Sequence, residues 1–216
     1  GRVHFPEASV SRERSIVGHE IQLFEDNVEW MSFQTMLGAL YPGQRIAVDI
    51  AGTAQSLLGI DAAMLERCHR NRYHASAVQI FACGPLDVEE LATNCNRALR
   101  SWPNRSDMAP RVAWAEARPG VRTVSMSLPR TRRMLAFPDE IPHQGLALMR
   151  HELAMEMTLD ILFGPGSEFF SRHYESGLLD GETFGGEVHM DEGYGFCVLS
   201  ADADDPDALQ AAILEE

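Results

Sequence analysis

Helix-like and strand-like stretches of this chain come in groups and do not alternate along its length. Apolar residues recur at three- and four-residue steps over residues 9–40, which predicts a helix, and a second helix is expected over 61–72. The apolar run at 77–83 predicts a buried strand, and an acidic capping pattern predicts a helix over 87–102. This order does not fit a regular repeat of strand, helix and parallel strand.

The second half of the chain shows the same grouping. Strands are expected at residues 122–128, 133–137, 183–190 and 194–201. Helices are expected at residues 144–163, 168–179 and from 204 onward. The last two strands are separated by Asp191-Glu192-Gly193, which is typical of a hairpin turn. The prediction is an α+β fold in which an antiparallel sheet packs with helices.

The charge of the chain bears on its partners. The 216 residues carry a net charge of −14, and the 18 basic residues are all arginines. This acidic balance argues against nucleic acid as the main partner. Twelve of the arginines lie in residues 67–133. A dipolar surface, two lobes that attract each other, and a basic channel for an acidic or peptide substrate are all open explanations.

Cysteine usage and hydropathy bear on location and domain organisation. The four cysteines contain no close pair, so neither a zinc knuckle nor a thioredoxin-like motif can be drawn. No apolar run approaches the roughly 20 residues that span a bilayer, so we expect a cytoplasmic protein without a membrane partner. Residues 103–120 are rich in Pro, Asn, Ser and Arg, which predicts a linker with a domain boundary near Met108.

Two glutamates on the first predicted helix are candidates for a metal site. Glu13 and Glu20 are seven residues apart, and seven steps of about 100° bring both side chains within about 20° of one helix face. Val17 continues that face, where a carboxylate is costly to bury unless it meets a cation or a metal. From the residues alone another explanation stays open, namely exposed acids paired with Arg12 and Arg14.

Longer stretches of the sequence resemble a known family. DNVEW (26–30), DIAGTAQSL (49–57) and RCHRNRYHASAVQIFACG (67–84) resemble, in order and spacing, the back half of the first domain of the pitrilysin/insulinase zinc metallopeptidases, the inverzincins. Residues 151–180 and 191–209 resemble the front half of the family's second domain. The resemblance covers essentially the whole chain and is strongest with a bacterial branch of short, two-domain proteins.

The resemblance implies a fold and roles for the two glutamates. In the family an inverted H-x-x-E-H motif supplies two histidine ligands and the general base, and a downstream E-x(6)-E helix supplies the third zinc ligand. By that match Glu20 is the zinc ligand and Glu13 is the acid that supports it. The fold implied is pitrilysin-like (LuxS/metallohydrolase-like). Residues 1–108 would be the C-terminal half of the first, peptidase domain, and residues 109–216 the N-terminal half of the second, substrate-clamping domain.

Two departures from the family limit what carries over. H-x-x-E-H does not occur in the sequence, so the zinc site is incomplete and we expect this chain alone to be inactive. In active relatives an arginine and a tyrosine, seven residues apart around a Gly-Leu dipeptide, hold the substrate backbone. The matching positions here are His173 and Asp180, and Arg172 and Tyr174 are the nearest substitutes.

The function implied is zinc-dependent hydrolysis of unfolded peptides by a longer parent, of which a chain opening on Gly1 would be a central segment. The alternative is a non-catalytic pitrilysin-like subunit that binds a peptide or an active partner chain. His173 and Asp180 favour this alternative, whereas the retained Glu13 and Glu20 favour the peptidase. Dividing two domains midway leaves sheet edges and apolar faces uncovered, so we expect a homo-oligomer or a heterodimer with a related chain.

Overall fold

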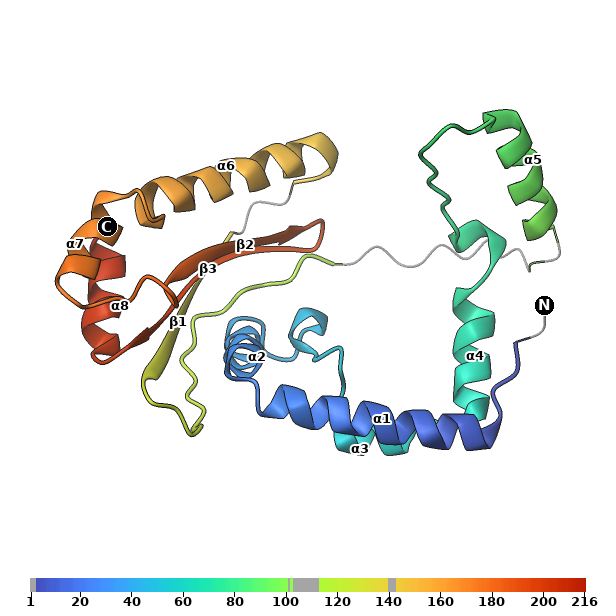
Figure 1. The fold of residues 1–216 in the computed structure, drawn as a ribbon, viewed down its shortest axis with the longest axis horizontal. Coiled ribbons are helices and arrows are strands. Elements are labelled where there is room, and N and C mark those ends of the chain that lie inside the picture. Colours follow the sequence, from blue (N-terminus) through green and yellow to red (C-terminus); the bar gives the residue numbers. More distant parts are fainter. Residues whose placement is uncertain (1–2, 101, 103–112, 140–142) are drawn as a thin grey trace. The chain divides into compact units, whose positions relative to one another are not determined.

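The computed structural model describes residues 3–100, 102, 113–139 and 143–216. The chain divides into two compact units, one formed by residues 1–20 and 53–111 and the other by residues 21–52 and 112–216 (Figure 1). Helix α1 (Glu7–Glu25) begins in the first unit and ends in the second. The boundary expected near Met108 lies outside the described residues, and the division into domain halves at 1–108 and 109–216 stays a prediction.

The first unit is helical wherever its described residues have regular structure. Besides the start of α1 it holds α3 (Ala54–Leu58), α4 (Ala62–Arg72), the 3₁₀ turn η2 (Ala75–Ala77) and α5 (Val88–Leu99). The three later α-helices each follow a residue whose side chain accepts a backbone N–H of the first turn, namely Thr53, Asp61 and Asp87. Such caps satisfy donors that a helix start leaves without partners. The helices predicted at 61–72 and 87–102 are confirmed, the second ending at Leu99.

Two predicted strands are wrong. Residues 77–83 and 122–128 are not in strands: Ala77 ends the 3₁₀ turn η2, and the rest of both segments has no regular structure. Ile80 and Phe81 are 52% and 89% exposed, so the first segment does not have the burial that its composition predicts. A strand exists only when a neighbour accepts and donates its backbone hydrogen bonds, and no described strand pairs with either segment. Composition identified segments suited to a sheet, but not whether this chain supplies the partner strand.

The predicted helix over 9–40 is in fact two helices, α1 and α2 (Val28–Leu40). The Asn27 side chain accepts a 2.8 Å hydrogen bond from the Trp30 N–H and so caps α2. Asparagine favours caps because its side chain competes with the backbone for hydrogen bonds. The apolar periodicity runs on through the break and therefore hides it. A short 3₁₀ turn, η1 (Arg45–Ala47), follows α2.

Three antiparallel strands form the sheet of the second unit: β1 (Thr131–Pro138), β2 (Gly185–Asp191) and β3 (Tyr194–Ala203). Their order is β1-β3-β2, so β3 is central. Asp191 pairs with Tyr194, which leaves a two-residue turn and confirms the predicted hairpin. The strand predicted at 133–137 is confirmed within β1.

Helices cover both faces of this sheet (Figure 1). One face is covered by α2, and the other by α6 (Gly145–Phe163), α7 (Glu168–Glu175) and α8 (Pro206–Glu215). Val198 of β3 lies in the core under α2 with Tyr41, whereas the next residue, Leu199, lies in the opposite core with Phe169. This alternation is the two-residue period of a strand. The α+β class with an antiparallel sheet is confirmed.

Helix α6 is apolar on two opposite faces. Leu159 and Phe163 pack into the core beneath the sheet. The opposite side carries an outer stripe of five side chains, each at least 50% exposed: Leu146, Met149, Leu153, Met157 and Ile161. Their three- and four-residue spacing puts them along one line of the helix. A helix that is apolar all round is typical of a buried position, so the outer stripe lacks a cover among the described residues.

Opposite charges meet within and beside the sheet of the second unit. Arg130 Nη1 lies 2.9 Å from Asp180 Oδ2, and Arg130 Nη2 lies 3.0 Å from Asp204 Oδ2. Arg132 lies 2.7 Å from Asp202. Part of the arginine-rich middle of the chain therefore pairs with its acidic C-terminal part, and these pairs lie within the second unit.

Candidate functional site

The two glutamates expected to serve a zinc ion lie on α1. Glu13 and Glu20 are both exposed, and the helix keeps them two turns apart on one side. Neither forms an ion pair with another described residue, so the pairing with Arg12 or Arg14 is not seen. Within the described part of the chain, no three side chains of His, Cys, Asp or Glu are grouped closely enough to hold a metal ion.

The residues at the positions of the family's arginine and tyrosine have structural contacts. The ring of His173 packs on Phe169, with ring centres 4.5 Å apart. Asp180 accepts hydrogen bonds of 2.8 Å from both the backbone N–H and the hydroxyl of Thr183, and it pairs with Arg130. These contacts account for both residues without a role in binding a substrate.

The pKa of Asp180 follows from these contacts. Desolvation by partial burial acts to raise the pKa. The hydrogen bonds from Thr183 and Glu182, together with the charge of Arg130, outweigh it and hold the pKa below its ordinary value. Asp180 is therefore a carboxylate at neutral pH and an acceptor, not a donor suited to an oxyanion.

The two substitutes expected on α7, Arg172 and Tyr174, are exposed. Two helical steps of about 100° separate them, so they point to different sides of α7. Tyr174 stacks on Phe170, with ring centres 5.9 Å apart and nearly parallel planes. Phe170 in turn lines a groove beside β2, so Tyr174 lies next to that groove.

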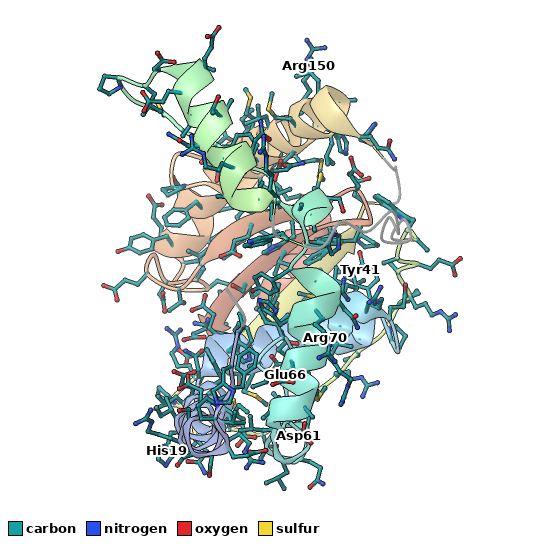
Figure 2. All side chains as sticks on the ribbon, turned by 90° about the vertical axis from the view of Figure 1, so that its right-hand side faces the viewer. His19, Tyr41, Asp61, Glu66, Arg70 and Arg150 are labelled. Carbon is teal, nitrogen blue, oxygen red and sulfur yellow. The ribbon has the colours of Figure 1, made fainter. Side chains whose placement is uncertain are left out.

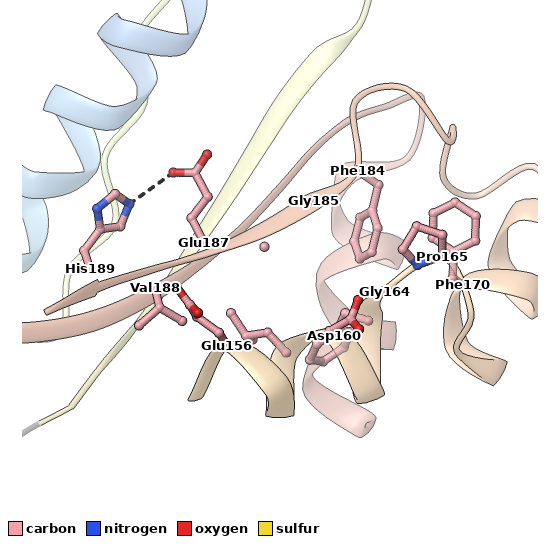
Figure 3. Close-up of a pocket in the computed structure, with 13 residues that line it drawn as sticks. Glu156, Asp160, Gly164, Pro165, Phe170, Phe184, Gly185, Glu187, Val188 and His189 are labelled. Atoms are coloured by element: carbon pink, nitrogen blue, oxygen red, sulfur yellow. Dashed lines mark hydrogen bonds and ion pairs between the residues drawn. The ribbon is translucent and has the colours of Figure 1, made fainter. Parts of the chain in front are cut away.

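This groove runs between α6 and β2 and has a volume of about 600 Å³ (Figure 3). Glu156 and Asp160 rise from α6 toward β2, and Glu187 and His189 project from β2 on the side away from α6. Side chains from both faces of β2 line it, so the groove follows the edge of the strand. The apolar side chains that line the groove include Phe163 and Phe184.

A glycine lets α6 and the sheet come close at this groove. A Cβ on Gly186 would lie 3.0 Å from Leu199 Cδ2 and 3.4 Å from Leu159 Cδ1. The glycine therefore brings the helix and the strand together where the groove forms. Sequence reasoning missed the groove. The available signals were Gly185-Gly186 at a strand start and two acids one helical turn apart at 156 and 160.

The groove is acidic, and contacts with neighbouring side chains hold two of its lining residues in place. Glu187 Oε2 lies 3.1 Å from His189 Nε2. The His189 ring stacks on Phe196 at 4.9 Å and contacts Phe33 at 5.1 Å. Three carboxylates and no arginine are found among the residues that line the groove. Its electrostatic character therefore suits a cationic ligand.

None of the helices in the described part of the chain is long and apolar enough to cross a membrane.

Comparison with known proteins places these features in a family. A family described as "Peptidase M16 inactive domain" matches residues 59–216, which include the groove but not Glu13 or Glu20. A Bacillus subtilis protein described as an uncharacterized zinc protease, YmfH, is 28% identical over 211 residues, which are 95% of this chain and 49% of that protein.

Solved structures share the fold. An M16-like peptidase from Alicyclobacillus acidocaldarius superposes with a TM-score of 0.78 at 23% identity, over 98% of this chain and 51% of that one. A chain of Complex III2 from Candida albicans superposes with a TM-score of 0.71 at 14% identity, over 90% of this chain and 47% of that one. This chain thus spans about half the length of the proteins it matches. The family match covers well over half of the sequence, and the chain therefore belongs to the peptidase M16 family, the pitrilysin-type peptidases.

Proposed function

We propose that the chain is a segment of a zinc-dependent metallopeptidase that hydrolyses peptide bonds in unfolded peptides, and that the segment alone is inactive. The family match over residues 59–216 carries this proposal. The description of the B. subtilis relative as a zinc protease supports it. The chain spans about half the length of that relative, so a longer protein would supply the rest of the active centre.

The residues described here do not by themselves fit a zinc ion. Glu20 is exposed on α1, and no group of three ligand-type side chains lies within the described ranges. A catalytic zinc ion takes three protein ligands. We therefore assign Glu20 as one ligand, and Glu13 as the acid that orients it, only in the longer protein. Their position on one side of one helix supports this assignment.

Two residues of α7 are the candidates for contact with a substrate. Arg172 and Tyr174 are exposed on α7 and are free to meet a peptide in the longer protein. Residues 1–108 and 109–216 would then be the adjoining halves of a peptidase domain and a substrate-clamping domain. The four free cysteines support a reducing, cytoplasmic location for this protein.

Zinc content and peptide cleavage by the full-length gene product test the proposal. Bound zinc in about a 1:1 ratio and cleavage of an unstructured peptide that a chelator stops are expected. Glu20→Gln should remove both, and Glu13→Gln should weaken both. Glu25→Gln, on the same helix, is the matched control and should retain both. The 216-residue chain alone should neither retain zinc nor cleave.

A full-length protein without zinc or activity would point to the alternative function. A metal-free, inactive full-length protein would contradict the proposal and favour a non-catalytic subunit that binds a peptide or an active partner chain. A chain of similar fold occurs in Complex III2 of C. albicans, and this occurrence would then support a subunit role.

A further inference from the structure

A segment without regular structure is fixed against the C-terminal end of α2. The Glu116 backbone N–H donates a 2.9 Å hydrogen bond to the side-chain oxygen of Gln44, and the Glu116 carbonyl accepts one from the same side chain. Two residues further on, the Arg118 N–H donates a 2.8 Å hydrogen bond to the carbonyl of Leu40, the last residue of α2. These bonds hold the backbone in a defined place just before residue 119.

A pocket of about 410 Å³ lies where this segment meets α2. It is lined by Ala39 and Pro42 on one side and by residues 118–123 on the other, and we call it the arginine pocket. Gly120 permits a close approach there, because a Cβ at this position would lie 3.0 Å from the Ala39 carbonyl oxygen. All of the lining belongs to the second unit, so the pocket is formed within one unit.

The arginine pocket has two positive charges without a counter-charge in the described part of the chain. Arg118 and Arg122 are exposed and form no ion pair or side-chain hydrogen bond with another described residue. By contrast, Arg130 and Arg132, a few residues further along, pair with aspartates. No carboxylate is found among the described residues that line the pocket, although the whole chain has a net charge of −14. The pocket is therefore a local site for a negatively charged ligand.

The other polar groups of the pocket add donors. The Thr123 hydroxyl can donate, and the backbone N–H groups of Val121 and Arg122 have no backbone acceptor among the described residues. One effect opposes an anion, because the C-terminal end of a helix carries about half a negative charge. Two guanidinium charges outweigh it. The pocket thus suits an oxyanion, whose oxygens accept paired hydrogen bonds from arginine.

The number of donors favours a phosphate group over a carboxylate. A single guanidinium can satisfy both oxygens of a carboxylate. A phosphate monoester has three terminal oxygens and a charge of about −1.5 to −2 at pH 7, which matches two guanidinium groups and a hydroxyl. Ala39, Pro42, Pro119 and Val121 add apolar surface, which a small apolar body attached to the phosphate can cover.

We propose that the arginine pocket binds a small phosphate monoester whose apolar part lies against the apolar residues of the lining. Arg118 and Arg122 bind the phosphate oxygens, and Gly120 lets the segment lie against the end of α2. The pocket shares no residue with the groove beside β2 and includes neither Glu13 nor Glu20, so the proposal does not rest on the proposed function.

Isothermal titration calorimetry on the 216-residue chain measures binding, with phenyl phosphate as the probe. Benzoate has a similar ring and a single negative charge, and phenol has the ring alone. At about pH 7.5 and low salt, phenyl phosphate should bind at least about tenfold more tightly than benzoate, because it offers two arginines more charge and more acceptors. Phenol should not bind measurably. Equal binding of benzoate, or no heat from phenyl phosphate up to about 10 mM, would overturn the proposal.

Single substitutions locate the site. Arg118→Gln and Arg122→Gln should each weaken binding of phenyl phosphate by about fivefold or more, because each removes a charge-assisted contact. The controls are Arg150→Gln on α6 (Figure 2) and Arg172→Gln on α7, which remove the same charge at exposed arginines outside the pocket. They should change binding by less than about twofold. Equal weakening in all four variants would overturn the proposal, since the attraction would then depend on net charge alone.

Chemical protection locates the ligand on the unaltered chain. Phenylglyoxal modifies exposed arginines, and peptide mass spectrometry measures the rate at each one. Phenyl phosphate at about twice its dissociation constant should slow modification of Arg118 and Arg122 by about threefold, because about two thirds of the sites are then occupied. Modification of Arg150 should not change. Equal protection of Arg150, or no protection of Arg118 and Arg122, would overturn the proposal even if a substituted chain failed to fold.

Discussion

Arg132 Nε lies 2.7 Å from Asp202 Oδ1, and the two residues also face each other in the register of β1 and β3. The hydrogen bond from Arg132 to Asp202 is the largest of the effects that raise the pKa of Arg132. The side chains are 14% and 28% exposed, so water screens this pair less than a surface pair. The outer strand β1 is thus fixed to the central strand by charge as well as by the backbone ladder.

Arg132→Leu should lower the free energy of unfolding by about 1–3 kcal/mol, because it leaves Asp202 half-buried without its cation. Urea unfolding followed by circular dichroism measures the change. The matched control is Arg70→Leu on α4, where Arg70 and Glu66 are 3.9 Å apart and exposed (Figure 2). That loss should cost less than about 0.5 kcal/mol. Equal losses in the two variants would contradict a structural role for the sheet pair.

Asp180 should make stability depend on pH in the acid range. Its folded pKa is lowered, so its contribution is complete above the ordinary carboxyl pKa of about 4 and is lost as the pH falls through the folded pKa. The difference in unfolding free energy between wild type and Asp180→Asn should be largest near neutral pH and shrink on acidification. A difference in unfolding free energy that grows toward acid pH would contradict the lowered pKa of Asp180 in the folded state.

Tyr41→Phe should lower the unfolding free energy by about 1 kcal/mol. The hydroxyl of Tyr41 is buried and donates a 3.1 Å hydrogen bond to the Gly195 carbonyl. The loss is modest because that carbonyl keeps its hydrogen bond from Asp139. Tyr73→Phe, at an exposed tyrosine on the C-terminal side of α4, is the control and should have no measurable effect. Equal stability of the two variants would argue that water replaces the lost bond.

The four thiols should react with a chromogenic disulfide reagent at different rates. Cys68 and Cys83 are exposed, whereas Cys197 is buried in β3, and burial raises the pKa of its thiol. Because the thiolate is the reactive form, Cys197 should react only after unfolding. Cys197→Ala should remove the slowest phase and leave the fast one unchanged. If the slow phase remained after this substitution, the slowly reacting thiol would be another cysteine.

The uncovered surfaces should make the chain self-associate, as the sequence predicts. The outer stripe of α6 and the exposed segment around Phe81 supply apolar area. Sedimentation velocity should therefore show a concentration-dependent shift. Leu153→Gln with Met157→Gln should weaken the association by about fivefold or more, because apolar area is removed from the contact. Ile50→Gln, at an exposed site outside the outer stripe, is the control. A monomer at every concentration would count against the expectation.

Local patterns predicted much of the second unit. The spacing around Asp191 fixed the hairpin, and the apolar periodicity over 144–163 fixed α6. Residues 77–83 show the limit: their composition suits a strand, but a strand also needs a partner, which a local pattern does not reveal. Asn27 shows a second limit, because a cap inside a continuous apolar period has only one residue to signal it.

The candidate site was likewise predicted only in part from the sequence. The helix period puts Glu13 and Glu20 on one side of α1, and the structure has that helix. The role of the two glutamates was inferred from resemblance and stays a prediction. The sequence held signals for the groove at Gly185-Gly186 and at the acids 156 and 160, but it did not show that α6 and β2 lie side by side. That neighbourhood depends on close packing at Gly186, which is far from α6 in sequence.

The two apolar faces of α6 have a consequence for mutational scanning. In the isolated chain, polar substitutions along the outer stripe should be tolerated, since those side chains already face water. In a longer protein that covers the helix, the same substitutions should be as harmful as core mutations. Tolerance at Leu153 or Met157 would then depend on whether a longer protein covers α6, and not on the stability of this chain. Positions that are tolerant in a scan of the isolated chain but sensitive in a scan of the longer protein would mark the residues that the longer protein covers.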